Sequence, residues 1–224
     1  MTTKLKKSKK YSLTKLAGNW RESIFSSIHS VHLKRAVSVL SACGCRPSEL
    51  ERGILVKLRD GVLSIGIQGS KVDEEAKRGQ LLRQLDIDQT TPWGCFLLEQ
   101  VASQPNAATI IKYDAGGVSQ RLREKSRELW PRRKSLVSAY SYRHFIGKSL
   151  KESGEPKDKI AATLGHASDF SQHAYGYAGR GKLSSGQHGV LNAVSSNPIR
   201  HSAKTDRHLQ FAKATNPVIK GEQA

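Results

Sequence analysis

Residues 164–177 read LGHASDFSQHAYGY and set one histidine directly after a glycine, with tyrosines nine and eleven residues further on. A glycine at such a point ends the preceding helix, because it adopts a left-handed backbone conformation without a steric penalty. The chain then leaves the helix and presents His166 on a loop. Ser168 opens a pair of good capping residues, so a second helix carrying Tyr175 and Tyr177 is predicted to follow.

The sequence before this stretch mixes helical and extended patterns. Apolar spacing, capping residues and bounding glycines predict helices over residues 30–43, 46–53, 91–103, 116–130, 138–154 and 155–165. Two β-rich runs flank Asp60-Gly61, a strong hairpin dipeptide, and residues 79–88 are predicted to form a third strand. The predicted fold class is α+β, mainly α-helical, with a small three-stranded antiparallel sheet.

Composition predicts three segments. Residues 1–12 are expected to form a flexible basic tail, since like charges repel and nothing apolar anchors them. The candidate DNA-binding lysines of this tail are Lys4, Lys6, Lys7, Lys9 and Lys10. Residues 13–180 are expected to form one compact domain. Residues 181–224, rich in Gly, Ser, Asn and Pro, are expected to form an extended tail.

The charge of the chain points to its partners. Lysine and arginine total 37 against 19 aspartate and glutamate residues, which gives a formal net charge of +18. Nucleic acid is the first candidate partner, because each neutralised phosphate releases a counterion. No apolar run approaches the roughly 18 residues that a membrane span needs, and no apolar stretch follows the basic N-terminus as in a secretory signal. We therefore expect a cytoplasmic protein associated with DNA or the nucleoid, and no membrane partner.

Two arginines lie at positions suited to anions. Arg46 directly precedes the helix predicted at PSEL, where free backbone N–H groups and the helix dipole favour negative charge. Glu49, three residues on, can reach back and hold that arginine. Arg143 lies on the helix predicted over 138–154. Taken singly, each of these arginines is better interpreted as an ordinary surface residue of a helix.

Taken together, these motifs have a specific order. GxRxxEL, a lysine after the second strand, YxxRH, LGH and a tyrosine nine residues after that histidine follow one another along the chain. The set resembles the tyrosine recombinase (phage integrase) family, over about residues 13–178. The resemblance implies the catalytic-domain fold of that family, and an active site that needs no metal and no other cofactor.

The resemblance also implies roles for four cationic or polar residues. Arg46 and Arg143 would clamp the non-bridging oxygens of the scissile phosphate. Lys71 would protonate the leaving 5′-oxygen, and His166 would hydrogen-bond a phosphate oxygen. Such groups fit the chemistry, because negative charge builds up in the five-coordinate transition state and fixed cations stabilise it.

The nucleophile implied by the resemblance is Tyr175, which would form a 3′-phosphotyrosine bond. Glu49 resembles the acidic residue that supports the site from behind. Tyrosine is a weak nucleophile at its ordinary pKa of about 10, so it needs cationic neighbours and a proton acceptor. The phosphotyrosine bond conserves the bond energy, and strand joining then needs no ATP.

Tyr140 departs from the family pattern, because the residue three positions before the second arginine is usually histidine. Tyrosine donates a hydrogen bond to phosphate but accepts a proton poorly at neutral pH. His144 or His166 would have to take that role instead. Two further assignments stay open, since Tyr177 is a second candidate nucleophile and Lys77 or Arg78 could replace Lys71 as the proton donor.

The predicted function is therefore that of a site-specific DNA recombinase, or integrase, of a mobile element. Its partners would be double-stranded DNA and further copies of itself, assembled as a tetramer on DNA. The segment 181–224 would either pack onto a neighbouring protomer or serve as a solubilising end. Competing functions are a catalytically weakened DNA-binding relative, a type IB topoisomerase-like enzyme without synapsis, and a basic RNA-binding protein. The last is disfavoured, since no cluster of surface aromatics is visible.

Overall fold

A computed structural model describes residues 13, 15–73, 75, 78–171 and 188–204. Tyr175, Tyr177 and Lys77 lie outside this part of the chain, as do the five lysines of residues 1–12. The helix predicted after Ser168 also lies mostly outside it; residues 169–171 form a single 3₁₀ turn.

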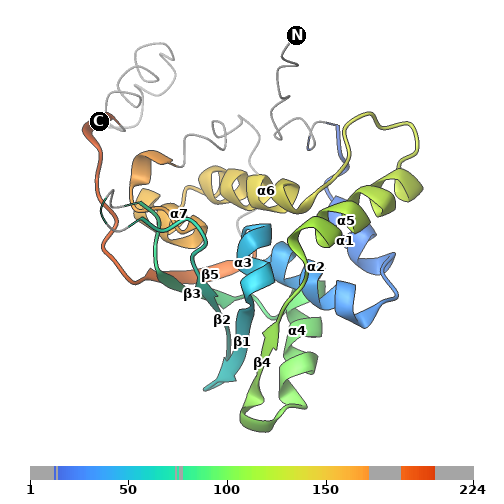
Figure 1. The fold of residues 1–224 in the computed structure, drawn as a ribbon, viewed down its shortest axis with the longest axis horizontal. Coiled ribbons are helices and arrows are strands. Elements are labelled where there is room, and N and C mark those ends of the chain that lie inside the picture. Colours follow the sequence, from blue (N-terminus) through green and yellow to red (C-terminus); the bar gives the residue numbers. More distant parts are fainter. Residues whose placement is uncertain (1–12, 14, 74, 76–77, 172–187, 205–224) are drawn as a thin grey trace, which may run out of the picture.

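The helices lie close to where the sequence predicts them (Figure 1). They are α1 (Trp20–Ser26), α2 (Val31–Cys43), α3 (Pro47–Arg52), α4 (Pro92–Ala102), α5 (Ala115–Leu129), α6 (Ala139–Glu152) and α7 (Lys157–Leu164). Local signals fix several ends: the Thr91 hydroxyl accepts from Gly94 N at 3.0 Å, and Gly44 ends α2 with φ 58°. Helix α1 is an addition to the predicted set.

The sheet is larger than predicted. Its strands are β1 (Ile54–Arg59), β2 (Val62–Gln68), β3 (Leu82–Ile87), β4 (Ala108–Ile111) and β5 (Val190–Ser195), in the order β4-β1-β2-β3-β5, all antiparallel. The prediction of three strands is therefore wrong by the two edge strands. Both are short and depend on pairing with distant residues, so neither carries a strong local pattern.

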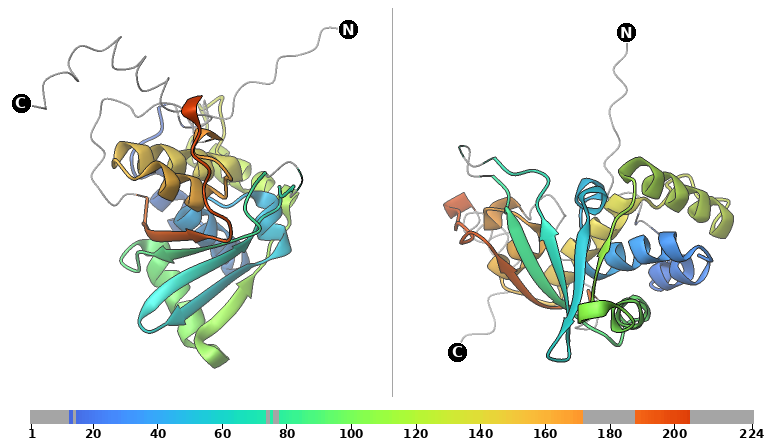
Figure 2. Two further views of the ribbon diagram at one scale, coloured as in Figure 1. Left: turned by 90° about the vertical axis from the view of Figure 1, so that its left-hand side faces the viewer. Right: turned by 60° about the horizontal axis from the view of Figure 1, so that its bottom comes forward.

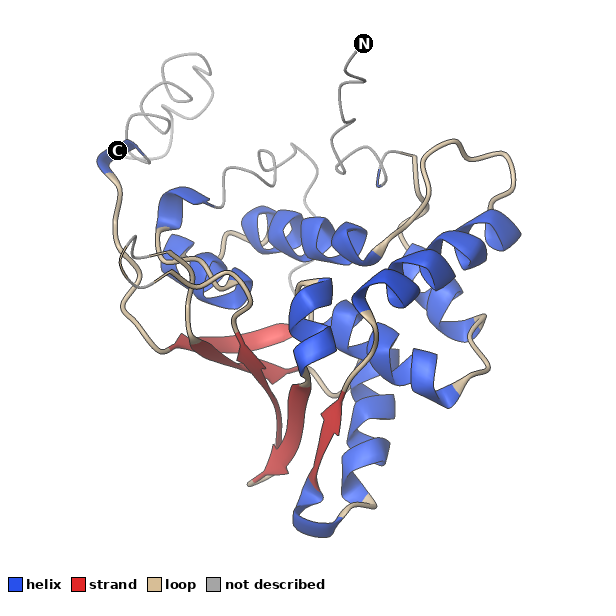
Figure 3. Ribbon diagram, in the orientation of Figure 1, coloured by secondary structure: helices blue, strands red, loops and turns tan. Residues whose placement is uncertain are grey.

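One face of the sheet is covered by helices, as Figures 2 and 3 show from three directions. Side chains alternate along β1, where Ile54 and Val56 are buried and Leu55 is exposed, and β2 and β3 follow the same period of two. The buried face packs on α2, α4 and α7. Burying each such aliphatic side chain stabilises the fold by about 1.5–3 kcal/mol.

Strand β5 changes the interpretation of the C-terminal region. The composition of segment 181–224 predicts an extended tail, but residues 190–195 pair with β3 from Ile87 to Arg83. The chain then continues beside the loop after α7, where Arg200 N donates to Ala167 O at 3.0 Å. The C-terminal segment thus forms part of the domain and reaches the loop that carries His166. The remaining residues, 205–224, lie outside the described part.

No helix in the described ranges combines the length and apolar character that crossing a bilayer requires.

Candidate active site

The predicted cationic residues meet around one cavity of about 290 Å³. Its lining includes Arg46 from the start of α3, Lys71 from the β2–β3 connection and His166 from the loop after α7. Arg78, an alternative to Lys71 as proton donor, lines it as well, and so does Arg200, which is not among the predicted site residues. Segments 25 to 154 residues apart in sequence therefore contribute positive charge to a single concave surface.

Arg46 is fixed at the N-cap position of α3. Its extended backbone (φ −74°, ψ 148°) leads directly into Pro47 at the first helical position, where a fixed φ favours helix initiation. Glu49 reaches back, as the spacing predicts: Oε2 accepts from Arg46 N at 2.8 Å and Oε1 from Arg46 Nη1 at 2.7 Å. The guanidinium is therefore held at the cavity while 12% of the side chain remains exposed.

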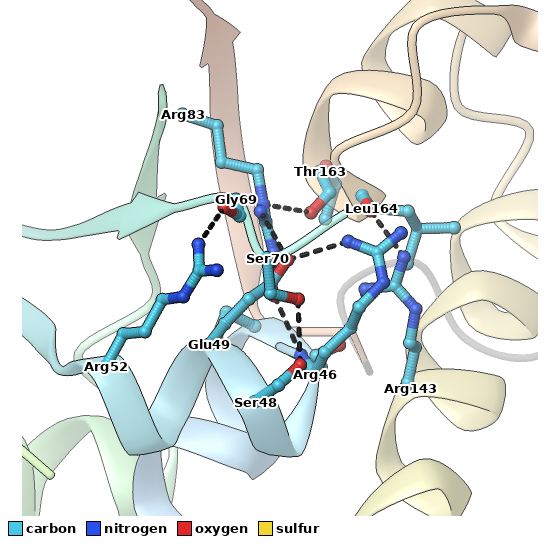
Figure 4. Close-up of polar contacts among 12 residues, drawn as sticks. Arg46, Ser48, Glu49, Arg52, Gly69, Ser70, Arg83, Arg143, Thr163 and Leu164 are labelled. Atoms are coloured by element: carbon cyan, nitrogen blue, oxygen red, sulfur yellow. Dashed lines mark hydrogen bonds and ion pairs between the residues drawn. The ribbon is translucent and has the colours of Figure 1, made fainter. Parts of the chain in front are cut away.

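Glu49 is buried and shared between two arginines (Figure 4). Arg83 on β3 donates to Glu49 Oε2 at 2.7 Å and to Oε1 at 3.2 Å, and its Nε donates to Thr163 O at 3.1 Å. Burial raises the pKa of the Glu49 carboxyl, but Arg83, Arg143 and Arg46 outweigh burial and lower this pKa to about 2. Glu49 is therefore a carboxylate at neutral pH.

Arg83 was missed in the sequence, although a signal was present. It lies on the buried face of β3 together with Leu85 and Ile87, and an arginine in such a position needs a buried partner. Its guanidinium also passes close to Gly165, where an added Cβ would lie 2.7 Å from Arg83 Nη1. Gly165 has φ 64°, so both the turn and the close approach require glycine here.

Arg143 lies behind the cavity wall rather than among its lining residues. Only 2% of it is exposed. Its Nη1 donates to Gly44 O at 3.2 Å and its Nη2 donates to Leu164 O, so it joins the ends of α2 and α7. Nη2 also lies 3.3 Å from His166 Nε2. Arg143 thereby supports the histidine.

His166 is fixed from several sides. Its backbone N–H donates to Ala161 O at 2.8 Å, which closes the end of α7, and its carbonyl accepts from Gln80 Nε2 at 3.2 Å. Arginine can only donate, so Nε2 accepts from Arg143 and the imidazole proton resides on Nδ1. Burial, then Arg143 and Arg46, lower the pKa of His166 to about 2. The imidazole is neutral at physiological pH.

This pKa predicts how stability depends on pH. The unfolded chain has a histidine pKa near 6.5, so below that value it binds a proton that the folded His166 does not. The stabilisation is complete above about pH 6.5 and is lost as pH falls, by up to about 1.4 kcal/mol per pH unit. The free energy of unfolding can be measured by urea denaturation at several pH values. Between pH 6 and 5 it is expected to fall less steeply with pH in His166→Asn than in the wild type. Equal slopes for both proteins would contradict the buried neutral imidazole; burial also lowers the pKa of His188, so some slope persists.

The β2–β3 connection carries Lys71 to the cavity. Asp73 and Arg78 form a backbone bridge, with N···O distances of 3.0 and 2.8 Å. Gly79 has φ 73°, and an added Cβ would lie 2.1 Å from Lys71 O, so glycine is needed for the two arms to come together. Lys71 and Arg78 both line the cavity, and the geometry leaves the choice between them open.

Tyr140 and His144 lie on α6 beside Arg143, and both are half-buried. Within the described residues, neither is part of the lining of the cavity, whereas His166 is. Tyr140, which departs from the family pattern, lies three residues before Arg143 on the same helix.

Comparison with solved structures identifies the fold. Crystal structures of XerA recombinase (TM-score 0.54, 18% identity) and of the XerH site-specific recombinase bound to difH substrate in a pre-cleavage complex (0.52, 15%) superpose on this chain. They cover 74% and 72% of it. The chain has the tyrosine recombinase catalytic-domain fold.

The comparison with known proteins rests on solved structures. No protein-family model matches the sequence, and no curated protein matches it either. The chain spans 60% of the length of XerA and 48% of that of XerH. The fold class predicted from the sequence is thus confirmed, with five strands in place of three.

Proposed function

We propose that this protein is a site-specific DNA recombinase that cuts and rejoins strands through a 3′-phosphotyrosine intermediate. The observation that carries the proposal is the cavity that joins Arg46, Lys71 and His166, with Arg143 directly behind it. Among the described residues, its lining contains four cationic side chains and no carboxylate. A phosphodiester is the anion that this arrangement and the net charge of +18 suit best.

The cationic cavity would act mainly on the transition state. Arg46 offers a planar fork whose orientation is fixed by Glu49, so binding a phosphate there costs little reorganisation. The phosphate contact of Arg143 that the resemblance implies remains a prediction. In the arrangement described here, Arg143 acts through His166 and two helix-terminal carbonyls.

His166 is our proposed proton acceptor for the attacking hydroxyl. In the free protein it is neutral and a weak base, because its Nε2 accepts from Arg143 and its pKa is low. A bound phosphate would bring negative charge beside the imidazole, which raises that pKa and makes it a better acceptor. Tyr140, the residue at the usual histidine position, is a poor acceptor and does not line the cavity in the described part of the chain. The work of the missing histidine therefore passes to His166.

The proposed nucleophile is Tyr175. Its oxygen would attack phosphorus and expel the 5′-oxygen, which takes up a proton from Lys71. The 3′-phosphotyrosine then yields to a 5′-hydroxyl from another strand, and the tyrosine regains its proton. The finer proposals are double-stranded DNA as substrate, a tetramer on DNA and a role in a mobile element.

The test uses nicked duplexes whose sequence is randomised around the nick, so that no target site has to be known. After cleavage, the short piece between the cut and the nick carries the free 5′-hydroxyl and diffuses away, which leaves the protein joined to the rest of the DNA. We expect an adduct that survives denaturing electrophoresis and disappears on protease digestion. The recovered sequence then serves in strand-joining assays between two duplexes. Absence of any adduct would overturn the proposal in favour of a DNA-binding relative, and relaxation of supercoiled DNA without joining would favour a topoisomerase.

Lys71→Ala is expected to slow cleavage of the recovered duplex about 10²–10⁴-fold, the usual contribution of general acid catalysis. A duplex with sulfur in place of the bridging 5′-oxygen has a leaving group that needs no proton. Cleavage of that duplex should be nearly as fast in Lys71→Ala as in the wild type. Arg78→Ala is the matched variant on the same connection. If the sulfur substrate rescues Arg78→Ala instead, the acid is Arg78.

A further inference from the structure

A second cavity, of about 610 Å³, adjoins the candidate active site. Both cavities are lined by Arg78 and Arg200, and both also include Gly79 and Ala167. The two arginines belong to different segments, one to the β2–β3 connection and the other to the segment after β5. They therefore stand on the boundary between the two cavities.

The backbone of Arg200 is attached to the loop after α7 that carries His166, which is the catalytic loop under the proposed function. Its N–H donates to Ala167 O at 3.0 Å, and its carbonyl accepts from Asp169 N at 3.2 Å. The buried Asp169 carboxylate then binds the next two residues, His201 Nδ1 at 2.7 Å and Ser202 N at 3.0 Å. The position of Arg200 is thus set by the same loop that carries His166.

Gln80 provides a second attachment of this segment. It is 1% exposed, donates to His166 O at 3.2 Å and accepts from Asn197 N at 2.9 Å. One side chain therefore joins the start of β3, the catalytic loop and the turn after β5. The segment that presents Arg200 is coupled to the position of His166.

The electrostatics of the second cavity favour an anion. Among the described residues, its lining holds one carboxylate, Asp73, against Arg78 and Arg200. The adjoining first cavity adds the charges of Arg46 and Lys71. The walls between the charges include Val72, Leu81 and Pro198, which suit the apolar faces of a sugar. Two planar guanidinium forks match the oxygens of a phosphate.

We propose that Arg78 and Arg200 bind the backbone phosphate next to the one that reacts. This inference rests on the proposed function, since it takes the first cavity as the site of the reacting phosphate. The C-terminal segment beyond the nucleophile would then contribute a DNA contact of its own. Adjacent phosphates follow each other along a strand, so two adjoining cationic cavities are the arrangement that a continuous DNA strand requires.

The first test measures binding to a fluorescein-labelled random-sequence duplex of about 30 base pairs at several salt concentrations. Each phosphate contact contributes about 0.9 to the slope of log K against log salt. Arg200→Ala is expected to reduce that slope by about 0.9 and to weaken binding at low salt about 10-fold, and Arg200→Lys should retain the slope. Arg59→Ala is the matched control. Arg59 is exposed and ends β1 opposite Val62, the first residue of β2, whereas the connection that carries Arg78 follows the last residue of β2. An Arg200→Ala slope equal to that of the wild type would overturn the inference.

The second test localises the contact on the recovered nicked duplex. A neutral methylphosphonate is placed at the phosphate on either side of the scissile one. One of the two should weaken wild-type binding and have little further effect on Arg200→Ala. Equal effects on both proteins would overturn the inference while the adduct still supports the proposed function. Failure of the wild type to form an adduct would overturn the proposed function, and with it the assignment of the first cavity to the reacting phosphate. Thermal melting of each variant shows whether it is folded.

Discussion

Replacing Tyr175 by phenylalanine is expected to abolish the covalent DNA adduct. The change removes one oxygen and leaves the ring, so folding and DNA binding should be unaffected. Loss of the attacking atom should lower the rate of adduct formation by at least about 10⁴-fold, the scale on which enzymes lose activity with their nucleophile. The yield of adduct on a denaturing gel measures this directly.

Tyr177→Phe is the matched control for this experiment. It removes the same atom two residues further along. On the helix that the sequence predicts here, residues two apart do not project from the same side. We expect near wild-type adduct formation from this variant. The opposite outcome, in which Tyr177→Phe is inactive and Tyr175→Phe is active, would move the nucleophile to Tyr177.

Replacing Glu49 by glutamine is expected to lower the free energy of unfolding by about 3–5 kcal/mol. Glutamine keeps the shape of the side chain but removes the charge, so the buried guanidinium of Arg83 is left uncompensated. Arg46 loses its partner in the same step, which should also reduce the rate of DNA cleavage. Urea denaturation at pH 7 measures the loss of stability.

Glu124→Gln is the control for Glu49→Gln. Glu124 pairs with Arg121 on the solvent-facing side of α5, where water screens the charges, so no measurable change in stability is expected. If both glutamine variants were equally stable, the buried ion pair would not hold the site together. The folded pKa of Glu49 lies below its unfolded value. Its contribution is therefore complete above about pH 4.5 and is lost as the pH falls toward 2.

Sequence was a good guide wherever the deciding interaction is local. Thr91 caps α4, Gly165 ends α7, and Glu49 reaches back to Arg46 over three residues. The order of Arg46, Lys71 and His166 along the chain also sufficed to predict that they meet, because the family resemblance carries that information.

Sequence failed where the deciding partner is far away in the chain. Strand β5 is defined by its pairing with β3, more than 100 residues earlier, and its own residues stand in a Gly- and Ser-rich background. The contacts of Gln80 and Arg200 depend on that pairing, since it brings residues 196–202 beside the loop that carries His166. Arg83 was missed as well, although its place on the buried side of the alternating pattern of β3 could be read from the sequence.

The most direct test of the account identifies the amino acid that is joined to DNA. The trapped adduct is digested with nuclease and trypsin, and the peptide that retains a nucleotide is sequenced by tandem mass spectrometry. Cleavage after Lys159 and Arg180 yields residues 160–180, which contain His166 and both candidate tyrosines. We expect a nucleotide that is joined through its 3′-phosphate to the oxygen of Tyr175. A nucleotide on a serine, or on a peptide outside residues 160–180, would contradict it.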